Sequence, residues 1–196
     1  MNHNALLDKY KDFLLVSEYN MCYEFEDGSR LEYKFEKKSF PHLIGLQKLI
    51  DIPIINEFNN SKNRKISAGF LIFRIKKERF LTDTIIRASS YFPEIQDRYD
   101  NFTRDNLLTV SYTDVIIDFN PILVGSSLKS KYILYEKTYS GYNYLCIAES
   151  LKGDAYAETF FHNPTDRYIR NQHILKVKKV RIIDKQGNLY LEDALF

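Results

Sequence analysis

Residues 131–162, KYILYEKTYSGYNYLCIAESLKGDAYAETFFH, contain three short runs rich in Ile, Tyr and Phe. Turns separate the runs, for example at Ser140-Gly141. Short aromatic and β-branched runs between turn residues are typical of strands. Similar runs occur at 114–119, 175–184 and 188–193. The sequence therefore predicts an antiparallel meander of strands in the C-terminal part of the chain.

The part of the chain before residue 110 has a different pattern, because its apolar residues recur at steps of three and four. This spacing predicts a helix over 4–19. Asp27-Gly28 between two alternating segments predicts a β-hairpin over 21–36. Further helices are expected at 82–89 and 93–110, and a short helix or a turn plus a helix at 40–50. Pro53 makes 54–58 a separate short element. The segment 66–80 is expected to be a helix, although its β-branched residues would also allow a strand.

These elements in this order predict an α+β fold, in which a helical N-terminal half with a β-hairpin packs on a C-terminal antiparallel sheet. Strands and helices do not alternate regularly, which argues against a Rossmann fold or a TIM barrel. The 196 residues suit a single domain, 1–196. Its mainly helical part is expected to span 1–110 and its sheet part 111–196.

The chain carries no sequence feature of a secreted or membrane protein. No apolar run reaches the ~18 residues of a membrane span, and charged residues occupy the N-terminal stretch where a signal peptide would be apolar. We therefore expect a cytoplasmic protein without a membrane partner. Cys22 and Cys146 lack the spacing of a metal or redox motif, so both are expected to be buried thiols.

Several classes of chemistry lack their motifs. There is no glycine-rich nucleotide loop, no GxSxG, no HExxH and no carboxylate cluster at ligand spacing. A metal-dependent nuclease needs convergent carboxylates, so no metal is expected. The remaining His, Lys, Arg, Tyr and Thr suit a metal-independent ribonuclease, which needs a base, an acid and donors that hold charge on phosphorus. Many inert basic proteins contain the same residues.

The net charge of +2 conceals two strongly basic segments. Residues 62–79 carry seven basic side chains against Glu78, and residues 167–185 carry seven against Asp184. If the segments meet in the fold they would form one surface for RNA; otherwise they are solvated faces. The candidate RNA-binding residues are Lys62, Arg64, Lys65, Arg74, Lys76, Lys77, Arg167, Arg170, His173, Lys176, Lys178 and Lys179.

His42 is the strongest candidate for acid–base chemistry among the four histidines. It follows Pro41 and is expected near a helix N-terminus, which would lower the pKa of its imidazole and favour a neutral base. The alternative is a histidine that only caps that helix. His162 is expected at a strand end, where both a site residue and a plain surface residue are common.

The block Phe40–Leu49, FPHLIGLQKL, resembles the F-x-H-L-x-G-L block of the phage-associated barnase, EndoU, colicin and RelE-like nucleases, in particular the fourth family of that series. Later blocks over 91–108, 155–161 and 168–177 are also similar. The resemblance implies an α+β fold, endoribonuclease activity in phage, mobile-element or toxin contexts, and no cofactor. By motif match His42 carries over with Gly45, and Arg98 and Thr159 follow as further catalytic candidates.

Two functional hypotheses follow. The first is a metal-independent endoribonuclease that cleaves RNA by attack of the 2′-OH, with an antitoxin or immunity protein as a partner. The alternative is a non-catalytic, phage-encoded binder of nucleic acid or protein that uses the same basic face as an inhibitor or regulator. Convergence of His42, Arg98 and Thr159 would favour catalysis, whereas burial of His42 among apolar side chains would favour the binder.

Overall fold

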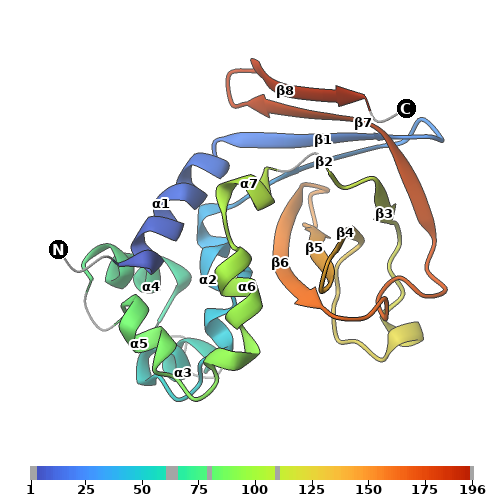
Figure 1. The fold of residues 1–196 in the computed structure, drawn as a ribbon. Helices are drawn as coiled ribbons and strands as arrows, with labels where there is room; N and C mark the ends of the chain where they lie inside the picture. The colour runs from blue at the N-terminus through green and yellow to red at the C-terminus, as the bar shows by residue number, and fades with distance from the viewer. Residues whose placement is uncertain (1–3, 61–65, 79–80, 109–110, 195–196) are drawn as a thin grey trace. The chain divides into compact units, whose positions relative to one another are not determined.

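The computed structural model describes residues 4–60, 66–78, 81–108 and 111–194, and the chain divides into two compact units (Figure 1). The first unit comprises the described residues of 1–16 and 36–107. The second comprises those of 17–35 and 108–196. The first unit is helical and the second contains the strands. The mixed helix and strand composition expected from the sequence is thus confirmed.

The first unit is built from short helices around an aromatic core. Helix α1 (Ala5–Val16) buries Leu6, Tyr10, Phe13 and Val16, the face that the helical spacing predicts. Edge-to-face and tilted ring contacts join α1 to α2, with the Tyr10 and Phe13 rings 5.0 and 5.4 Å from one ring of α2. The other α-helices are α2 (Phe40–Leu43), α3 (Pro53–Asn59), α4 (Ala68–Lys76), α5 (Asp83–Arg87), α6 (Gln96–Asn101) and α7 (Arg104–Leu107).

The single helix expected over 93–110 is wrong. The chain forms a 3-10 turn at Phe92–Glu94, then α6, and then α7. Phe102 leaves the helical conformation at ψ 83° and buries its ring 5.8 Å from that of Phe13. Helical turns restart at Thr103, whose hydroxyl accepts a hydrogen bond from the Asn106 N–H at 3.2 Å. Burial of one aromatic side chain therefore overrides the helical spacing of the segment.

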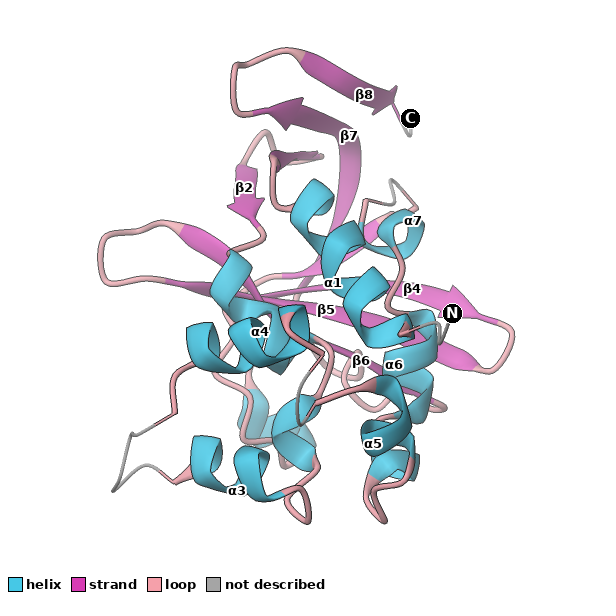
Figure 2. Cartoon of the chain, turned by 90° about the vertical axis from the view of Figure 1, so that its left-hand side faces the viewer, coloured by secondary structure: helices cyan, strands magenta, loops and turns pink. Residues whose placement is uncertain are grey.

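The second unit is a closed barrel of seven strands, with the eighth strand added outside the ring (Figure 1). The order around the ring is β1-β2-β6-β5-β4-β3-β7, and β7 pairs with β1 to close it. Figure 2 shows β4, β5 and β6 running side by side. The strands are β1 (Tyr19–Phe25), β2 (Arg30–Lys34), β3 (Asp114–Ile116), β4 (Tyr132–Thr138), β5 (Gly141–Glu149), β6 (Ala155–Asn163), β7 (Ile174–Asp184) and β8 (Leu189–Ala194).

The barrel corrects two details of the predicted sheet. The hairpin β1–β2 belongs to the barrel rather than to the helical unit. The sheet is also not wholly antiparallel, because β2 pairs with β6 in parallel at Tyr33 and Ala155. Both details follow from the closure of the sheet into a ring, which pairs β1 with β7 and the end of β2 with β6.

The barrel interior is filled by large apolar side chains. Residues opposite one another in paired strands point to the same face, and Tyr23 lies opposite Val180. Glu32 and Lys34 point to the other face of β2 and are exposed, which identifies the Tyr23 face as the interior. Tyr23 and Tyr33 are both buried and their rings stack at 5.9 Å. Burial raises the pKa of both phenols.

A smaller cluster covers part of the outer face of the barrel. Ile116, Tyr144 and Cys146 pack there with Phe119 and Val124 from the segment between β3 and β4. Cys146 is buried as expected, whereas Cys22 is only half-buried, and neither forms a disulfide. Within the described ranges, no helix has the length and apolar character needed to cross a membrane.

Candidate active site

His42 is the exposed residue of helix α2, whose other three residues are buried. Pro41 occupies the first turn, where its missing N–H is not needed, and so directs the chain into the helix. The His42 imidazole lies against the ring of Phe58 on α3, with ring centroids 5.2 Å apart. One side of the imidazole thus rests on an aromatic ring while the side chain stays open to solvent. This is not the burial among apolar side chains that would favour a non-catalytic protein.

The end of α2 explains the glycine of the F-x-H-L-x-G-L block. Gly45 has a φ of +90°, which a residue with a side chain rarely adopts. A Cβ added to Gly45 would lie 2.9 Å from Cδ of Arg98 and 3.0 Å from a methyl carbon of Ile95. The bare Cα therefore lets the half-buried side chain of Arg98 cross over the end of α2.

Arg98 connects α6 to α2. Its Nη1 donates a long hydrogen bond of 3.5 Å to the backbone carbonyl of His42. The guanidinium is thus held at the residue that carries the exposed imidazole, although 56 residues separate the two in the sequence. Among the three catalytic candidates, His42 and Arg98 are brought together within one unit.

The expected position of His42 at a helix N-terminus needs correction. Helix α2 has only four residues, so His42 lies in its last turn as much as in its first. The Gly45 N–H donates to the His42 carbonyl at 3.1 Å, as at a helix C-terminus. Because both ends of so short a helix are equally near, α2 does not place the imidazole at a helix N-terminus alone.

Thr159, the third candidate, belongs to the second unit. It is half-buried on β6, where it pairs with Cys146 next to an irregularity in the β5–β6 register. Glu158, the preceding residue, accepts a hydrogen bond of 2.7 Å from the hydroxyl of buried Ser130. The arrangement around Thr159 is therefore that of a strand bulge held by a neighbouring loop.

His162 is fixed within the barrel. Its Nδ1 lies 3.1 Å from Oδ1 of Asn143, and its Nε2 lies 3.3 Å from both the hydroxyl and the carbonyl oxygen of Ser140. These contacts hold the β4–β5 turn to β6. They explain His162 as a residue that stabilises a hairpin.

The first basic segment is only partly described. Lys62, Arg64 and Lys65 lie outside the described residues. Arg74, Lys76 and Lys77 lie on or directly after α4, each over an aromatic ring. The cation to ring-centroid distances are 4.8 Å for Arg74 over Phe70, 5.5 Å for Lys76 over Tyr10 and 6.0 Å for Lys77 over Phe73.

The second basic segment is largely engaged with other groups of the barrel unit. Arg167 donates to the backbone carbonyls of Val124 and Gly125. Three further cations form ion pairs, Arg170 with Asp166 at 2.7 Å, Lys179 with Glu192 at 2.9 Å and Lys185 with Glu18 at 2.8 Å. His173, Lys176 and Lys178 are exposed.

Two features of the helical unit could not be identified from the sequence. Phe58, which supports the His42 ring, occurs in an unremarkable apolar segment, and the contact between them depends on how α3 packs. A pocket beside α3 is lined by Glu57 and Arg74, which no motif connects. Among the described residues, no group of three or more His, Cys, Asp or Glu could hold a metal ion.

His42 combines an exposed imidazole with a backbone carbonyl that accepts a hydrogen bond from Arg98. An imidazole and a guanidinium are groups that can carry out acid–base chemistry on a phosphate. A family model described as phage-Barnase-EndoU-ColicinE5/D-RelE like nuclease 4 matches residues 5–190. The chain therefore belongs to this nuclease family, and the resemblance seen in its sequence is confirmed. The family implies a nucleic acid substrate. No curated protein and no solved structure matches the chain.

Proposed function

We propose that the protein is a metal-independent endoribonuclease whose reaction takes place at His42 and Arg98. The observation that carries the proposal is the seating of Arg98 over Gly45, with its Nη1 on the carbonyl of the residue that bears the exposed imidazole. The proposal rests on the helical unit alone. Thr159 and the basic residues of the barrel are not required by it.

The proposed reaction begins when the His42 imidazole takes the proton of an RNA 2′-OH. The 2′-oxygen then attacks phosphorus, and the bond from phosphorus to the 5′-oxygen breaks. Negative charge accumulates on the phosphoryl oxygens, where the Arg98 guanidinium stabilises it. The 5′-oxygen leaves as it takes up a proton from water, and the other product carries a 2′,3′-cyclic phosphate. The protonated His42 imidazole then returns its proton to the solvent.

Cleavage of matched RNA and DNA oligonucleotides in EDTA tests this reaction. We expect the RNA to be cut and to yield a cyclic phosphate, because the nucleophile is its own 2′-OH. DNA of the same sequence should remain intact. Cleavage of DNA, or loss of RNA cleavage in EDTA, would show that the reaction is of another kind.

Substitution of the two residues tests their assignment. His42→Ala should lower kcat by about 10²- to 10⁴-fold, the usual cost of removing a general acid or base. Arg98→Ala should lower it as well, while Lys48→Ala, an exposed residue of the following turn, should leave it unchanged. A His42→Ala protein that folds normally and cuts RNA at the parent rate would overturn the proposal.

The non-catalytic alternative predicts a different outcome of the same experiment: RNA is bound, the bound RNA stays intact, and His42→Ala has no effect. The family's phage and toxin association also supports an antitoxin or immunity protein as a partner. Separate expression of the parent and of His42→Ala in a bacterial host, each with and without the protein encoded next to it, tests this expectation. We expect the parent to arrest growth and His42→Ala not to do so. The neighbouring protein should restore growth in cells that express the parent.

A further inference from the structure

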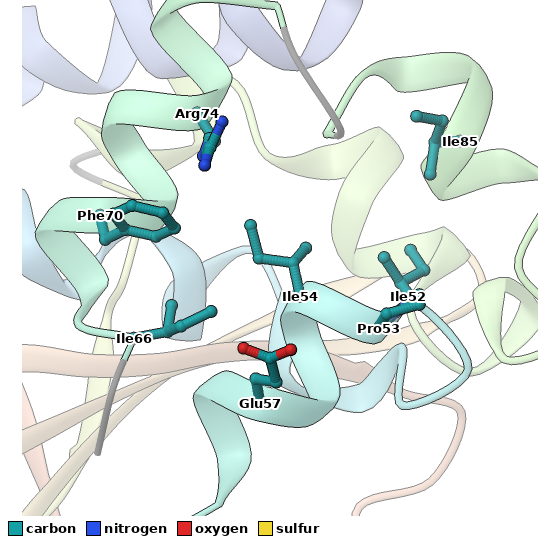
Figure 3. Close-up of a pocket in the computed structure, with 8 residues that line it drawn as sticks. All are labelled: Ile52, Pro53, Ile54, Glu57, Ile66, Phe70, Arg74 and Ile85. Atoms are coloured by element: carbon teal, nitrogen blue, oxygen red, sulfur yellow. The ribbon is translucent and has the colours of Figure 1, made fainter. Parts of the chain in front are cut away.

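A pocket of about 500 Å³ opens in the helical unit between α3, α4 and α5, a size typical of small-molecule sites (Figure 3). Its walls are mostly apolar. Among the described residues, two charged side chains line it, Glu57 of α3 and Arg74 of α4. The remaining lining residues are Ile52, Pro53, Ile54, Ile66, Phe70 and Ile85. The proposed reaction at His42 and Arg98 uses none of these residues.

One wall of the pocket is a stacked pair of planar groups. The guanidinium of Arg74 lies over the ring of Phe70, 4.8 Å from its centroid, and both side chains are half-buried. Figure 3 shows Phe70 and Arg74 next to each other on α4, with Ile54 opposite and Glu57 on the adjoining wall. Planar groups and branched aliphatic side chains together suit a flat, partly apolar ligand.

The carboxylate restricts which flat ligands fit. Glu57 is exposed at the pocket rim, and an ionised carboxylate only accepts hydrogen bonds. Adenine, cytosine and guanine each present an exocyclic amine that can donate to it. Uracil presents carbonyl oxygens on either side of its single N–H, and these oxygens are repelled by a carboxylate. The lining therefore matches a nucleobase that carries an amino group.

Helix α3 links this pocket to the candidate active site. Ile54 and Glu57 line the pocket, and Phe58 contacts the His42 ring at 5.2 Å. Positions 54, 57 and 58 are spaced i, i+3 and i+4, so their side chains are neighbours on one helix face. A nucleotide whose base enters the pocket would thus place its backbone near His42.

We infer that the pocket between α3, α4 and α5 is a base-binding subsite for an amino-bearing nucleobase of the RNA. The inference rests on the proposed function, because it assigns a part of the same substrate. Phe70 and Arg74 would stack on the base, and Glu57 would accept a hydrogen bond from its amine. The subsite makes the enzyme prefer cytosine over uracil at the position it reads.

Cytidine and uridine 5′-monophosphate are matched probes, because their bases have the same size. Cytosine carries a 4-amino group next to an unprotonated N3, and uracil carries a 4-oxygen next to an N3–H. Titration of the intact protein with each, followed by NMR, measures binding without any cleavage. We expect CMP to bind about tenfold more tightly than UMP, the effect of one hydrogen bond to a charged acceptor. Glu57→Gln should remove this preference, since the Gln amide can also donate to the uracil oxygen.

Matched controls separate the pocket from the surface around it. Phe70→Ala should weaken binding of both nucleotides, whereas Phe73→Ala on the same helix, exposed and outside the pocket lining, should not. Glu94→Gln removes an exposed acid elsewhere in the unit and should preserve the preference. Ile85→Glu adds a charge at the rim and should block both nucleotides.

The results distinguish this inference from the proposed function. Equal binding of CMP and UMP by the parent, or an unchanged preference in Glu57→Gln, overturns the subsite even if RNA is cleaved through His42. Preferential CMP binding that depends on Glu57, in a protein that cleaves no RNA, supports the subsite and refutes the nuclease reaction. A pocket for an apolar protein side chain would give no nucleotide effect at all, and that result also overturns the inference.

Discussion

Gly45 has two structural roles next to His42: it ends α2, and it leaves room for the Arg98 side chain. Its positive φ ends α2, and its missing side chain leaves the space that Arg98 crosses. Ending the helix requires only the positive φ, whereas the passage of Arg98 also requires the space that a Cβ would occupy. Gly28 is a useful comparison, because it has a φ of +82° but nothing lies within 4 Å of an added Cβ.

Gly45→Ala should therefore destabilise the protein more than Gly28→Ala. A positive φ costs about 1–2 kcal/mol for a residue with a side chain. At Gly45 an overlap with Arg98 adds about 1–3 kcal/mol. Urea unfolding of the two variants measures the difference, and RNA cleavage should fall in Gly45→Ala alone. Equal destabilisation with full activity would reduce Gly45 to a turn residue.

At the scale of elements, Asp51 joins the turn that precedes α3 to the turn that follows α5. Its carboxylate accepts hydrogen bonds from the hydroxyl of Ser89 at 2.5 Å and from the N–H and hydroxyl of Ser90 at 2.8 and 2.9 Å. These donors favour the charged form and hold the pKa of Asp51 below its usual value. A single acid thus connects two segments 38 residues apart.

Asp51→Asn should lose stability in a pH-dependent way. Because the folded-state pKa of Asp51 is lowered, its contribution is present above the unfolded value of about 4 and disappears as pH falls through the folded value. Urea unfolding at pH 7 should show the variant less stable than the parent, and the gap should close towards pH 3. Asp97→Asn, an exposed acid of the same unit, should show a smaller gap at pH 7. A gap independent of pH would mean that the carboxylate charge is irrelevant.

The segment between β3 and β4 depends on Arg167. This guanidinium donates through two nitrogens to the carbonyls of Val124 and Gly125, at the end of the 3-10 helix Pro121–Val124. Such charge-assisted hydrogen bonds satisfy carbonyls that have no partner within the helix. The sequence predicts Arg167 as an RNA contact, but its donors are already directed at the protein.

Arg167→Lys should loosen this segment, because an ammonium cannot reproduce the planar fork. We expect a loss of about 1–2 kcal/mol and faster amide exchange at 122–126. Arg170→Lys alters an exposed ion pair with Asp166 and should cost clearly less stability than Arg167→Lys. If Arg167→Lys changed RNA affinity but not exchange, the side chain would belong to the RNA surface after all.

At the scale of the whole molecule, the helices and strands could be predicted from the sequence better than the way they pair and pack with one another. Asp27-Gly28 forms the expected hairpin, because a short turn and alternating flanks act locally. The pairing of β1 with β7 joins residues such as Tyr23 and Val180, and no local pattern specifies it. His42 could be selected from its motif, whereas its contact with Phe58 required the folded chain.

The same limit applies to charge. Counting residues makes the two basic segments equivalent, but folding places them in different units and different surroundings. Lys176 lies opposite Asp114 in the β3–β7 register, and Lys179 is paired with Glu192. Lys76 and Lys77 are exposed in the unit that also carries His42. The cations near α4 therefore meet the conditions for RNA contacts better than those of β7.

The dependence of RNA affinity on salt should distinguish the two segments. Each phosphate contact to single-stranded RNA contributes about 0.7 to the slope of log K against log salt concentration. Lys76→Glu with Lys77→Glu should therefore reduce the magnitude of that slope by at least about 1.4. Lys176→Glu with Lys178→Glu makes the same charge change on β7 and should reduce it by less than half as much. Equal reductions, measured by titration from low to high salt, would show that both segments contact RNA and that neighbouring acids on the barrel do not weaken its cations.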